Sequence, residues 1–218
     1  MDEKKLVIFD LDGTLIDSLK DIALCTNSVL KSFGYKEHPI EAYKSFIGDG
    51  ARELVRRALP DSFVEEQLEE AVSIFKEVYG NKTAGNTKPF DGIYEMLDGL
   101  QESCEFALLS NKPHKFTLEY MENFFKDYPF KQIHGQKDDV PKKPDPAGVY
   151  NILKELPYQK EDVFYIGDTA TDMKTAVSAG LIPIGVLWGI QEKDTLLTNG
   201  AQYIVEFPSQ IVKIISNF

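Results

Sequence analysis

Four aspartates that follow two widely separated apolar segments could together hold a divalent cation. Asp10 and Asp12 come directly after segment 6–9, and side chains at i and i+2 of an extended segment face the same way. Asp168 and Asp172 follow segment 163–166, and an i, i+4 pair shares one face of a helix. No histidine or cysteine converges with these carboxylates, so we expect a hard cation, Mg²⁺ before Ca²⁺ or Mn²⁺. The alternative is a set of surface acids at strand ends.

Two further segments carry groups that could bind a phosphate. Ser110 and Asn111 follow the apolar segment 106–109, so the serine hydroxyl and the backbone N–H groups of the next helix could donate to an anion. Lys143 precedes a proline turn that opens another helix and could bring one positive charge to the same place. Taken singly, Ser-Asn is also ordinary N-cap chemistry and most lysines are solvated, so these alternatives stay open.

The elements that must position these residues alternate between strand and helix. Short apolar runs rich in β-branched residues predict strands at 6–9, 106–109, 163–166, 182–186 and 203–205. Helical patterns lie between or after them at 92–103, 114–126, 146–155, 170–179 and 208–216. This alternation predicts an α/β fold with a doubly wound parallel sheet, whose ligands bind outside the carboxyl ends of the strands.

The region from 16 to about 85 breaks that alternation. It has no strand signal, and helical patterns lie at about 18–33, 39–46, 50–59 and 63–80, followed by a Gly/Asn/Pro-rich connector at 80–89. We therefore predict a core domain formed by 1–15 and 86–218, and an inserted helical cap domain at 16–85. The two linkers between them could act as a hinge.

Charge and hydropathy exclude several classes of function. The formal net charge is −11, which disfavours nucleic-acid binding because that affinity comes from Lys and Arg at phosphates. The first apolar run, 6–9, is too short for a signal-peptide core or a membrane span. We expect a cytoplasmic protein with no nucleic-acid partner and no membrane association.

At four places in order, the chain resembles the haloacid dehalogenase superfamily. The motifs are Phe9-Asp10-Leu11-Asp12-Gly13-Thr14-Leu15, Leu109-Ser110-Asn111, Lys143-Pro144-Asp145-Pro146, and Gly167-Asp168-Thr169 followed by Asp172. The resemblance covers nearly the whole chain. It implies a Rossmann-like core, and the helical insert is similar to the cap of one large branch of that superfamily.

The resemblance implies a role for each motif residue. Asp10 would be the nucleophile that forms an aspartyl-phosphate, and Asp12 would be the general acid and then the general base. The carboxylates of Asp10 and Asp168 and the main-chain carbonyl of Asp12 would hold Mg²⁺, with Asp172 a further ligand or a group just outside the ligand set. The side chains that would stabilise the phosphoryl oxygens are those of Ser110 and Lys143.

The same resemblance narrows the reaction and the substrate. Dehalogenases of the superfamily lack the second aspartate, so Asp12 favours phosphoryl transfer. Segments 46–54 and 185–189 look like the phosphoglycolate phosphatase branch. The expected activity is Mg²⁺-dependent hydrolysis of a small phosphorylated metabolite, foremost 2-phosphoglycolate. A phosphosugar mutase and, more remotely, a phosphoaspartate receiver module are the alternatives.

The inserted region supplies candidate substrate-binding residues. Gly48 and Gly50 permit a tight turn and close backbone approach at a helix N-terminus. Arg52 could grip a substrate carboxylate, with Arg56 and Arg57 close by in the sequence. Together with Asn111, Gly48, Gly50 and Arg52 form the predicted substrate-binding set. A turn between two cap helices is the alternative. We expect a monomer or a homodimer.

Overall fold

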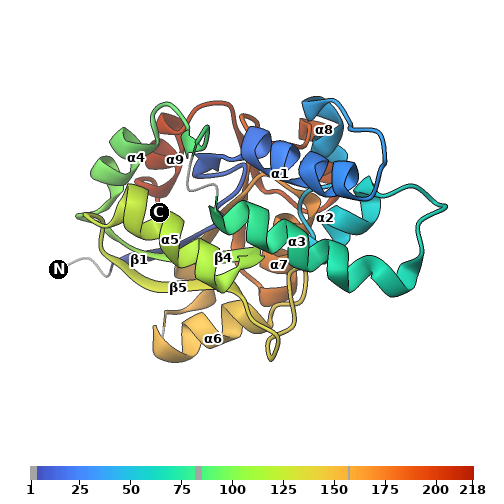
Figure 1. Cartoon of the computed structure of the whole chain (residues 1–218). Coiled ribbons are helices and arrows are strands. Elements are labelled where there is room, and N and C mark those ends of the chain that lie inside the picture. The colour runs from blue at the N-terminus through green and yellow to red at the C-terminus, as the bar shows by residue number, and fades with distance from the viewer. Residues whose placement is uncertain (1–3, 82–84, 157) are drawn as a thin grey trace.

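A parallel sheet forms the centre of the molecule (Figure 1). The computed structural model describes residues 4–81, 85–156 and 158–218. In this part of the chain the main sheet has six strands in the order β5-β4-β1-β6-β7-β8, and every neighbouring pair is parallel. The strands are β1 (Lys5–Phe9), β4 (Cys104–Pro113), β5 (Phe130–Gln136), β6 (Val163–Gly167), β7 (Ile182–Val186) and β8 (Tyr203–Val205).

The central strand β1 is apolar throughout because both of its faces are covered. Val7 and Phe9 belong to one hydrophobic cluster, and Leu6 and Ile8 belong to the other. Alternate side chains of a strand point to opposite faces, so the two clusters are the two layers of a doubly wound fold. Helices α4 (Ile93–Leu100), α5 (His114–Phe125) and α9 (Ser209–Ile215) cover the first face, and α6 (Ala147–Glu155) and α7 (Ala170–Ala179) cover the second. The predicted fold class is confirmed.

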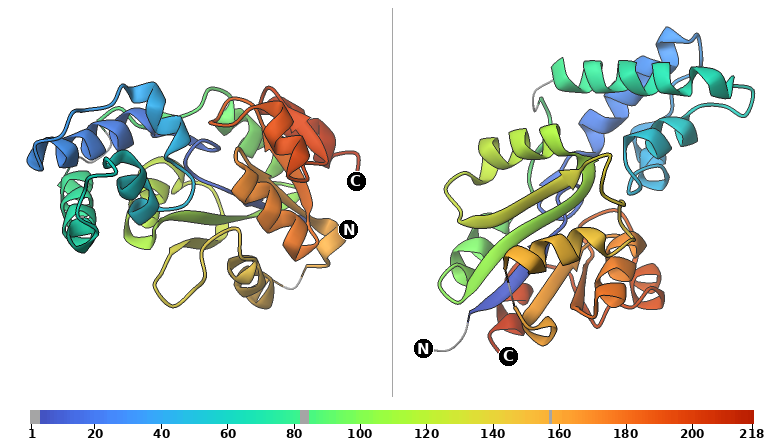
Figure 2. Two further views of the ribbon diagram at one scale, coloured as in Figure 1. Left: turned by 90° about the vertical axis from the view of Figure 1, so that its right-hand side faces the viewer. Right: turned by 90° about the horizontal axis from the view of Figure 1, so that it is seen from below.

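A helical insertion follows β1 and lies at the end of the molecule away from the C-terminus (Figure 2). It contains α1 (Leu19–Ser32), η1 (Ile40–Ser45), α2 (Ala51–Ala58), η2 (Glu65–Gln67) and α3 (Leu68–Asn81). Its buried apolar side chains, among them Val29, Leu54 and Phe75, join the cluster that covers the first face of the sheet. The insertion is therefore packed onto the core.

The two chain crossings between the sheet and the insertion lie side by side. Strands β2 (Ile16–Asp17) and β3 (Lys88–Pro89) pair antiparallel. Next to them the buried carboxylate of Asp21 accepts hydrogen bonds of 2.7–2.9 Å from the backbone and side chains of Asn86 and Thr87. These contacts join the entering and leaving chains. The predicted connector at 80–89 is described except for 82–84, and the predicted domain boundaries stay a prediction.

The structure adds elements that the sequence patterns did not predict. Strand β5 forms one edge of the sheet, and β4 continues to Pro113, past the predicted end at 109. A short helix, α8 (Lys193–Thr198), precedes β8, and η3 (Lys160–Asp162) precedes β6. Among the described residues, none of the helices has the length and apolar character needed to cross a bilayer.

Candidate active site

Three buried carboxylates meet at the carboxyl edge of the sheet. Asp10 directly follows β1, Asp168 directly follows the neighbouring strand β6, and Asp172 lies in the first turn of α7. Oxygens from the three side chains lie within 4.8 Å of one another. Parallel pairing of β1 with β6 brings the two strand ends together, so the predicted convergence of Asp10 and Asp168 is present. The Asp12 carboxylate, expected with them, lies outside this group and binds Lys112 instead.

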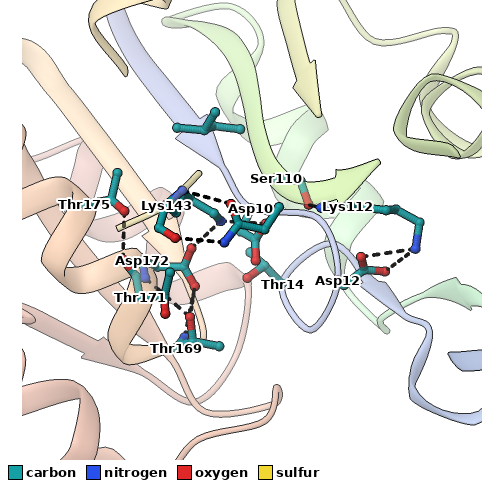
Figure 3. Close-up of polar contacts among 12 residues, drawn as sticks. Asp10, Asp12, Thr14, Ser110, Lys112, Lys143, Thr169, Thr171, Asp172 and Thr175 are labelled. Atoms are coloured by element: carbon teal, nitrogen blue, oxygen red, sulfur yellow. Dashed lines mark hydrogen bonds and ion pairs between the residues drawn. The ribbon is translucent and has the colours of Figure 1, made fainter. Parts of the chain in front are cut away.

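Asp168 and Asp172 are held by specific hydrogen bonds, and Figure 3 shows those of Asp172. Asp168 accepts from the hydroxyl of Thr14 at 3.1 Å and from the backbone N–H of Ile190 at 2.8 Å. Asp172 forms a capping box with Thr169 at the start of α7, in which its Oδ2 accepts from the Thr169 backbone N–H at 3.1 Å and its own N–H donates to the Thr169 hydroxyl. The threonine hydroxyl also donates to Oδ2 at 2.6 Å. The helix start therefore fixes the Asp172 carboxylate beside the other two.

Lys143 supplies the positive charge of the cluster. Its ammonium donates to Asp172 Oδ1 at 2.6 Å and lies 2.9 Å from Asp10 Oδ1. Its side chain is 3% exposed, so the sequence-based alternative of a solvated lysine is wrong. Although burial opposes it, the charges of Asp10 and Asp172 raise the pKa of Lys143 well above its ordinary value, which keeps the ammonium charged.

Burial and mutual repulsion disfavour the charged forms of Asp10 and Asp168. Burial raises the pKa of Asp10 from 3.8 to about 7; the charge of Lys143 opposes this rise and that of Asp172 adds to it. Burial, followed by the charges of Asp172 and Asp10, raises the pKa of Asp168 well above its ordinary value. One ammonium does not offset three buried carboxylates, and a divalent cation would.

The donor set fits a hard divalent metal. Among the buried side-chain nitrogen and oxygen atoms of the described residues, Asp10 Oδ1 is the one without a hydrogen bond. The Lys143 ammonium lies 2.9 Å away as an ion pair. Asp10 belongs to the ring of carboxylates formed with Asp168 and Asp172. Buried carboxylate oxygens are the ligands that Mg²⁺ prefers, so this cluster is a candidate Mg²⁺ site. Ligation by the carbonyl of Asp12 stays a prediction.

A small cavity lies over the cluster, between the core and the insertion. It has a volume of about 60 Å³. Its polar lining comes from the core and its apolar lining largely from the insertion. The lining includes Asp10, Asp12, Ser110, Asn111, Lys112 and Lys143 from the core, and Ile47, Gly48, Gly50, Leu54, Phe75 and Tyr79 from the insertion. The cavity therefore joins most of the predicted catalytic and substrate-binding residues.

The cap loop 48–50 is docked on the core. Asn111 Nδ2 donates to the carbonyl of Gly48 at 2.9 Å, and Asn111 also bonds to the backbone of Lys143. Gly50 has a φ of +86°, and a Cβ there would lie 3.3 Å from the Asn111 carbonyl oxygen, so the close approach favours glycine. Asn111 thus joins the second motif, the third motif and the cap loop.

Arg52 is placed differently from the other predicted residues. Its guanidinium donates to Glu69 at 2.8 Å and to Glu65 at 3.3 Å, and its side chain is 49% exposed. It is not among the residues that line the cavity. Of the neighbouring arginines, Arg57 pairs with Asp49 of the docked loop. Substrate binding by Arg52 stays a prediction. Its contacts with Glu65 and Glu69 hold the side chain at the outer surface of the insertion.

Sequence reasoning assigned no role to three polar side chains beside the predicted residues. Lys112 lines the cavity and binds Asp12, Tyr79 binds Lys112, and Asp49 holds the cap loop through Arg57 and Thr171. The one sequence signal for Lys112 is its place directly after Ser110-Asn111. Its partners are distant in the chain, so no spacing pattern points to them.

The fold and the site define a hydrolase of the haloacid dehalogenase-like class. The model of this family, described as haloacid dehalogenase-like hydrolase, matches residues 7–186, and the chain belongs to the family. The matched range includes all four acids, Asp10, Asp12, Asp168 and Asp172. The family assignment made from the motifs is confirmed.

Within the family, the chain is related to phosphoglycolate phosphatases. Phosphoglycolate phosphatase 1 of Pseudomonas aeruginosa is 33% identical over 224 residues, covering 97% of this chain and 82% of that protein. Phosphoglycolate phosphatase of Aquifex aeolicus is 31% identical over 214 residues, covering 98% and 97%. A crystal structure of a candidate phosphoglycolate phosphatase from Lactobacillus delbrueckii subsp. bulgaricus superposes with a TM-score of 0.91 at 26% identity, covering 98% of both chains.

Proposed function

We infer that the chain is a Mg²⁺-dependent phosphatase that hydrolyses a small phosphomonoester through an aspartyl-phosphate on Asp10. The observation that carries this inference is the Asp10 carboxylate. It is buried, its Oδ1 accepts no hydrogen bond from the described residues, and it lies beside Lys143 at the floor of a cavity that also holds Asp12. When one oxygen of this carboxylate binds the metal, the other can attack phosphorus.

The reaction then divides between the two aspartates of the first motif. Asp10 attacks phosphorus, the bond from phosphorus to the leaving oxygen breaks, and the carboxylic acid of Asp12 gives its proton to that oxygen. In the second step water attacks phosphorus, its proton passes to the Asp12 carboxylate, and the bond to Asp10 breaks to release phosphate. Bound Mg²⁺, held by Asp10 and Asp168, would supply positive charge that lets an anionic nucleophile approach a phosphate.

The remaining polar residues serve charge balance and position. Lys143 and the Ser110 hydroxyl, both at the cavity, stabilise the phosphoryl oxygens. Asp172 Oδ1 is paired with the Lys143 ammonium and Oδ2 accepts from Thr169, whereas Asp168 has only uncharged donors, Thr14 and Ile190. We therefore assign Asp172 chiefly to orienting Lys143, and we give it the weaker claim of the three acids to the metal.

2-Phosphoglycolate is the proposed substrate. The cavity lies beneath the docked loop 48–50, between the core and the insertion, an arrangement that suits a small phosphorylated molecule. The relatives that cover nearly the whole chain are phosphoglycolate phosphatases. Under this proposal the core performs hydrolysis, and the insertion at 16–85 acts as the cap that selects the substrate.

A phosphate-release screen over phosphorylated metabolites, with Mg²⁺ and with EDTA, tests the proposal. We expect release that requires Mg²⁺ and is fastest with 2-phosphoglycolate. Asp10→Asn should abolish turnover, and the matched control Asp61→Asn, at an exposed acid of the insertion, should leave it unchanged. Full activity in Asp10→Asn would exclude the covalent mechanism. Isomerised sugar phosphate without free phosphate would instead indicate a mutase.

A further inference from the structure

The ammonium group of Lys112 is buried between the core and the insertion. Its side chain is 4% exposed and extends from the end of β4 into the cavity. It donates to Asp12 Oδ1 at 3.0 Å, to Asp12 Oδ2 at 3.1 Å and to the hydroxyl of Tyr79 at 2.7 Å. An ammonium has three N–H donors. These three acceptors therefore occupy it, and no donor remains for a phosphoryl oxygen.

Lys112 restrains the Asp12 carboxylate. Figure 3 shows the two side chains pointing toward each other, apart from the group formed by Asp10, Lys143 and Asp172. The hydroxyl of Ser18 also donates to Asp12 Oδ1, at 2.5 Å. With both oxygens bonded, rotation of the carboxylate is restricted, which is what a group that must deliver a proton to one oxygen requires.

The same ammonium contacts the insertion through Tyr79, on α3. The Tyr79 hydroxyl accepts from Lys112 and donates to the hydroxyl of Tyr120, on α5, at 3.1 Å. The rings of Tyr79 and Tyr120 lie 4.6 and 4.7 Å from the ammonium, within cation–π range. The buried ammonium of Lys112 thus contacts both Asp12 and, through Tyr79, helix α3.

We propose that Lys112 is a positioning residue for Asp12, and that Tyr79 is the group through which the docked insertion sets this position. The inference deepens the proposed function, on which it rests, because it assigns the acid-base step to Asp12. It makes proton delivery depend on a residue of the insertion that does not itself react.

The test compares Lys112→Met and Tyr79→Phe with the control Tyr120→Phe. Methionine keeps an unbranched apolar stem but cannot bind Asp12, and Tyr79→Phe removes one hydroxyl that accepts from Lys112. Tyr120→Phe removes a hydroxyl from the same cluster that touches Tyr79 but accepts nothing from Lys112. All are assayed for kcat/KM with phenyl phosphate and p-nitrophenyl phosphate, which are similar in shape but differ in leaving-group basicity, and for kcat and KM with 2-phosphoglycolate.

We expect the loss in kcat/KM to be larger for the substrate with the more basic leaving group. Lys112→Met should lower kcat/KM about 100-fold for phenyl phosphate, the scale of a general-acid contribution, and only a few-fold for p-nitrophenyl phosphate, whose leaving group needs little protonation. With 2-phosphoglycolate, kcat should fall more than KM rises. Tyr79→Phe should show the same pattern at about fivefold, as for one hydrogen bond to a charged group, while Tyr120→Phe should match wild type.

Equal losses with both aryl phosphates, or equal effects of Tyr79→Phe and Tyr120→Phe, would overturn the inference and leave Lys112 a structural residue. If Lys112→Met does not fold, the comparison of the two tyrosine variants decides. Absence of phosphate release from wild type with every substrate would refute the proposed function itself. Active variants that lose the same kcat/KM with both aryl phosphates would refute only the role of Lys112.

Discussion

Replacing Asp10 by asparagine should stabilise the metal-free protein at alkaline pH. Asp10 is buried in a cluster with Asp168 and Asp172, and burial raises its pKa from 3.8 to about 7. A carboxyl group with a raised pKa in the folded state binds its proton more tightly there than in the unfolded chain. The contribution of Asp10 to the free energy of unfolding is therefore largest below about pH 4 and falls as pH rises through 7. Asparagine does not titrate and lacks this cost.

The size of the effect follows from the shift in pKa. A displacement of about three pKa units, at 1.36 kcal/mol each, destabilises the metal-free wild type by about 4 kcal/mol at pH 8. At pH 5 only part of the shift is expressed, and the cost is about 2 kcal/mol. The stability advantage of Asp10→Asn over wild type should grow by that difference between the two pH values.

Urea denaturation in EDTA at pH 5 and pH 8 measures this difference, with Asp61→Asn as the matched control at an exposed acid. Adding Mg²⁺ at 100 times its dissociation constant should then stabilise wild type by about 2.7 kcal/mol. The same Mg²⁺ concentration should stabilise Asp10→Asn less, because one ligand has lost its charge. An Asp10→Asn variant whose stability changes with pH as wild type does would refute the electrostatic reasoning.

Three further substitutions give distinct expected outcomes. Gly13→Ala should abolish Mg²⁺-dependent stabilisation and activity, because Gly13 has a φ of +87° and a Cβ there would lie 2.2 Å from Asp168 Oδ2; a Mg²⁺ titration followed by thermal unfolding checks it. Asp49→Ala should raise KM several-fold with little change in kcat, since the cap loop loses its 3.2 Å bond to Thr171; steady-state kinetics would show the reverse if the loop aided chemistry. Asp21→Asn should cost about 1–3 kcal/mol at pH 7. Burial opposes ionisation of Asp21, but hydrogen bonds from Asn86 and Thr87 hold its pKa below the ordinary value. The stability lost in Asp21→Asn should therefore be smaller at low pH, where wild-type Asp21 also becomes protonated. Urea unfolding at pH 7 and pH 3 measures this difference.

Strands that are covered on both faces could be predicted from the sequence. The runs at 6–9 and 163–166 are apolar because no side chain on either face meets water, and this also placed Asp10 and Asp168 at one edge of the sheet. Strand β5 escaped prediction because it forms an edge of the sheet and most of its side chains are only partly buried, so its sequence has no apolar run. Helix α8, with six residues, is too short for a periodic pattern.

The candidate site divides in the same way. Asp10, Asp168 and Asp172 lie at strand and helix ends, where local sequence determines position, and they converge as predicted. Lys112 has its acceptors 100 and 33 positions away in the chain, and only tertiary packing brings them to it. Arg52 shows the converse. Its place in segment 46–54 and its guanidinium suggested a substrate contact, which stays a prediction; in the structure Glu65 and Glu69 of the insertion bind this guanidinium.

The pairing of the two linkers restricts how the insertion can move. Since β2 binds β3 and Asp21 binds Asn86 and Thr87, the entering and leaving chains form one attachment to the core, and we expect any rotation of the insertion to take place about an axis through it. Rotation about that axis would displace the loop 48–50 and Tyr79 together, because both belong to the rotating body. Opening the entrance for the exchange of substrate and product would then also withdraw Tyr79 from Lys112, so under the proposed mechanism Asp12 would lose part of its restraint whenever the cavity is exposed to solvent.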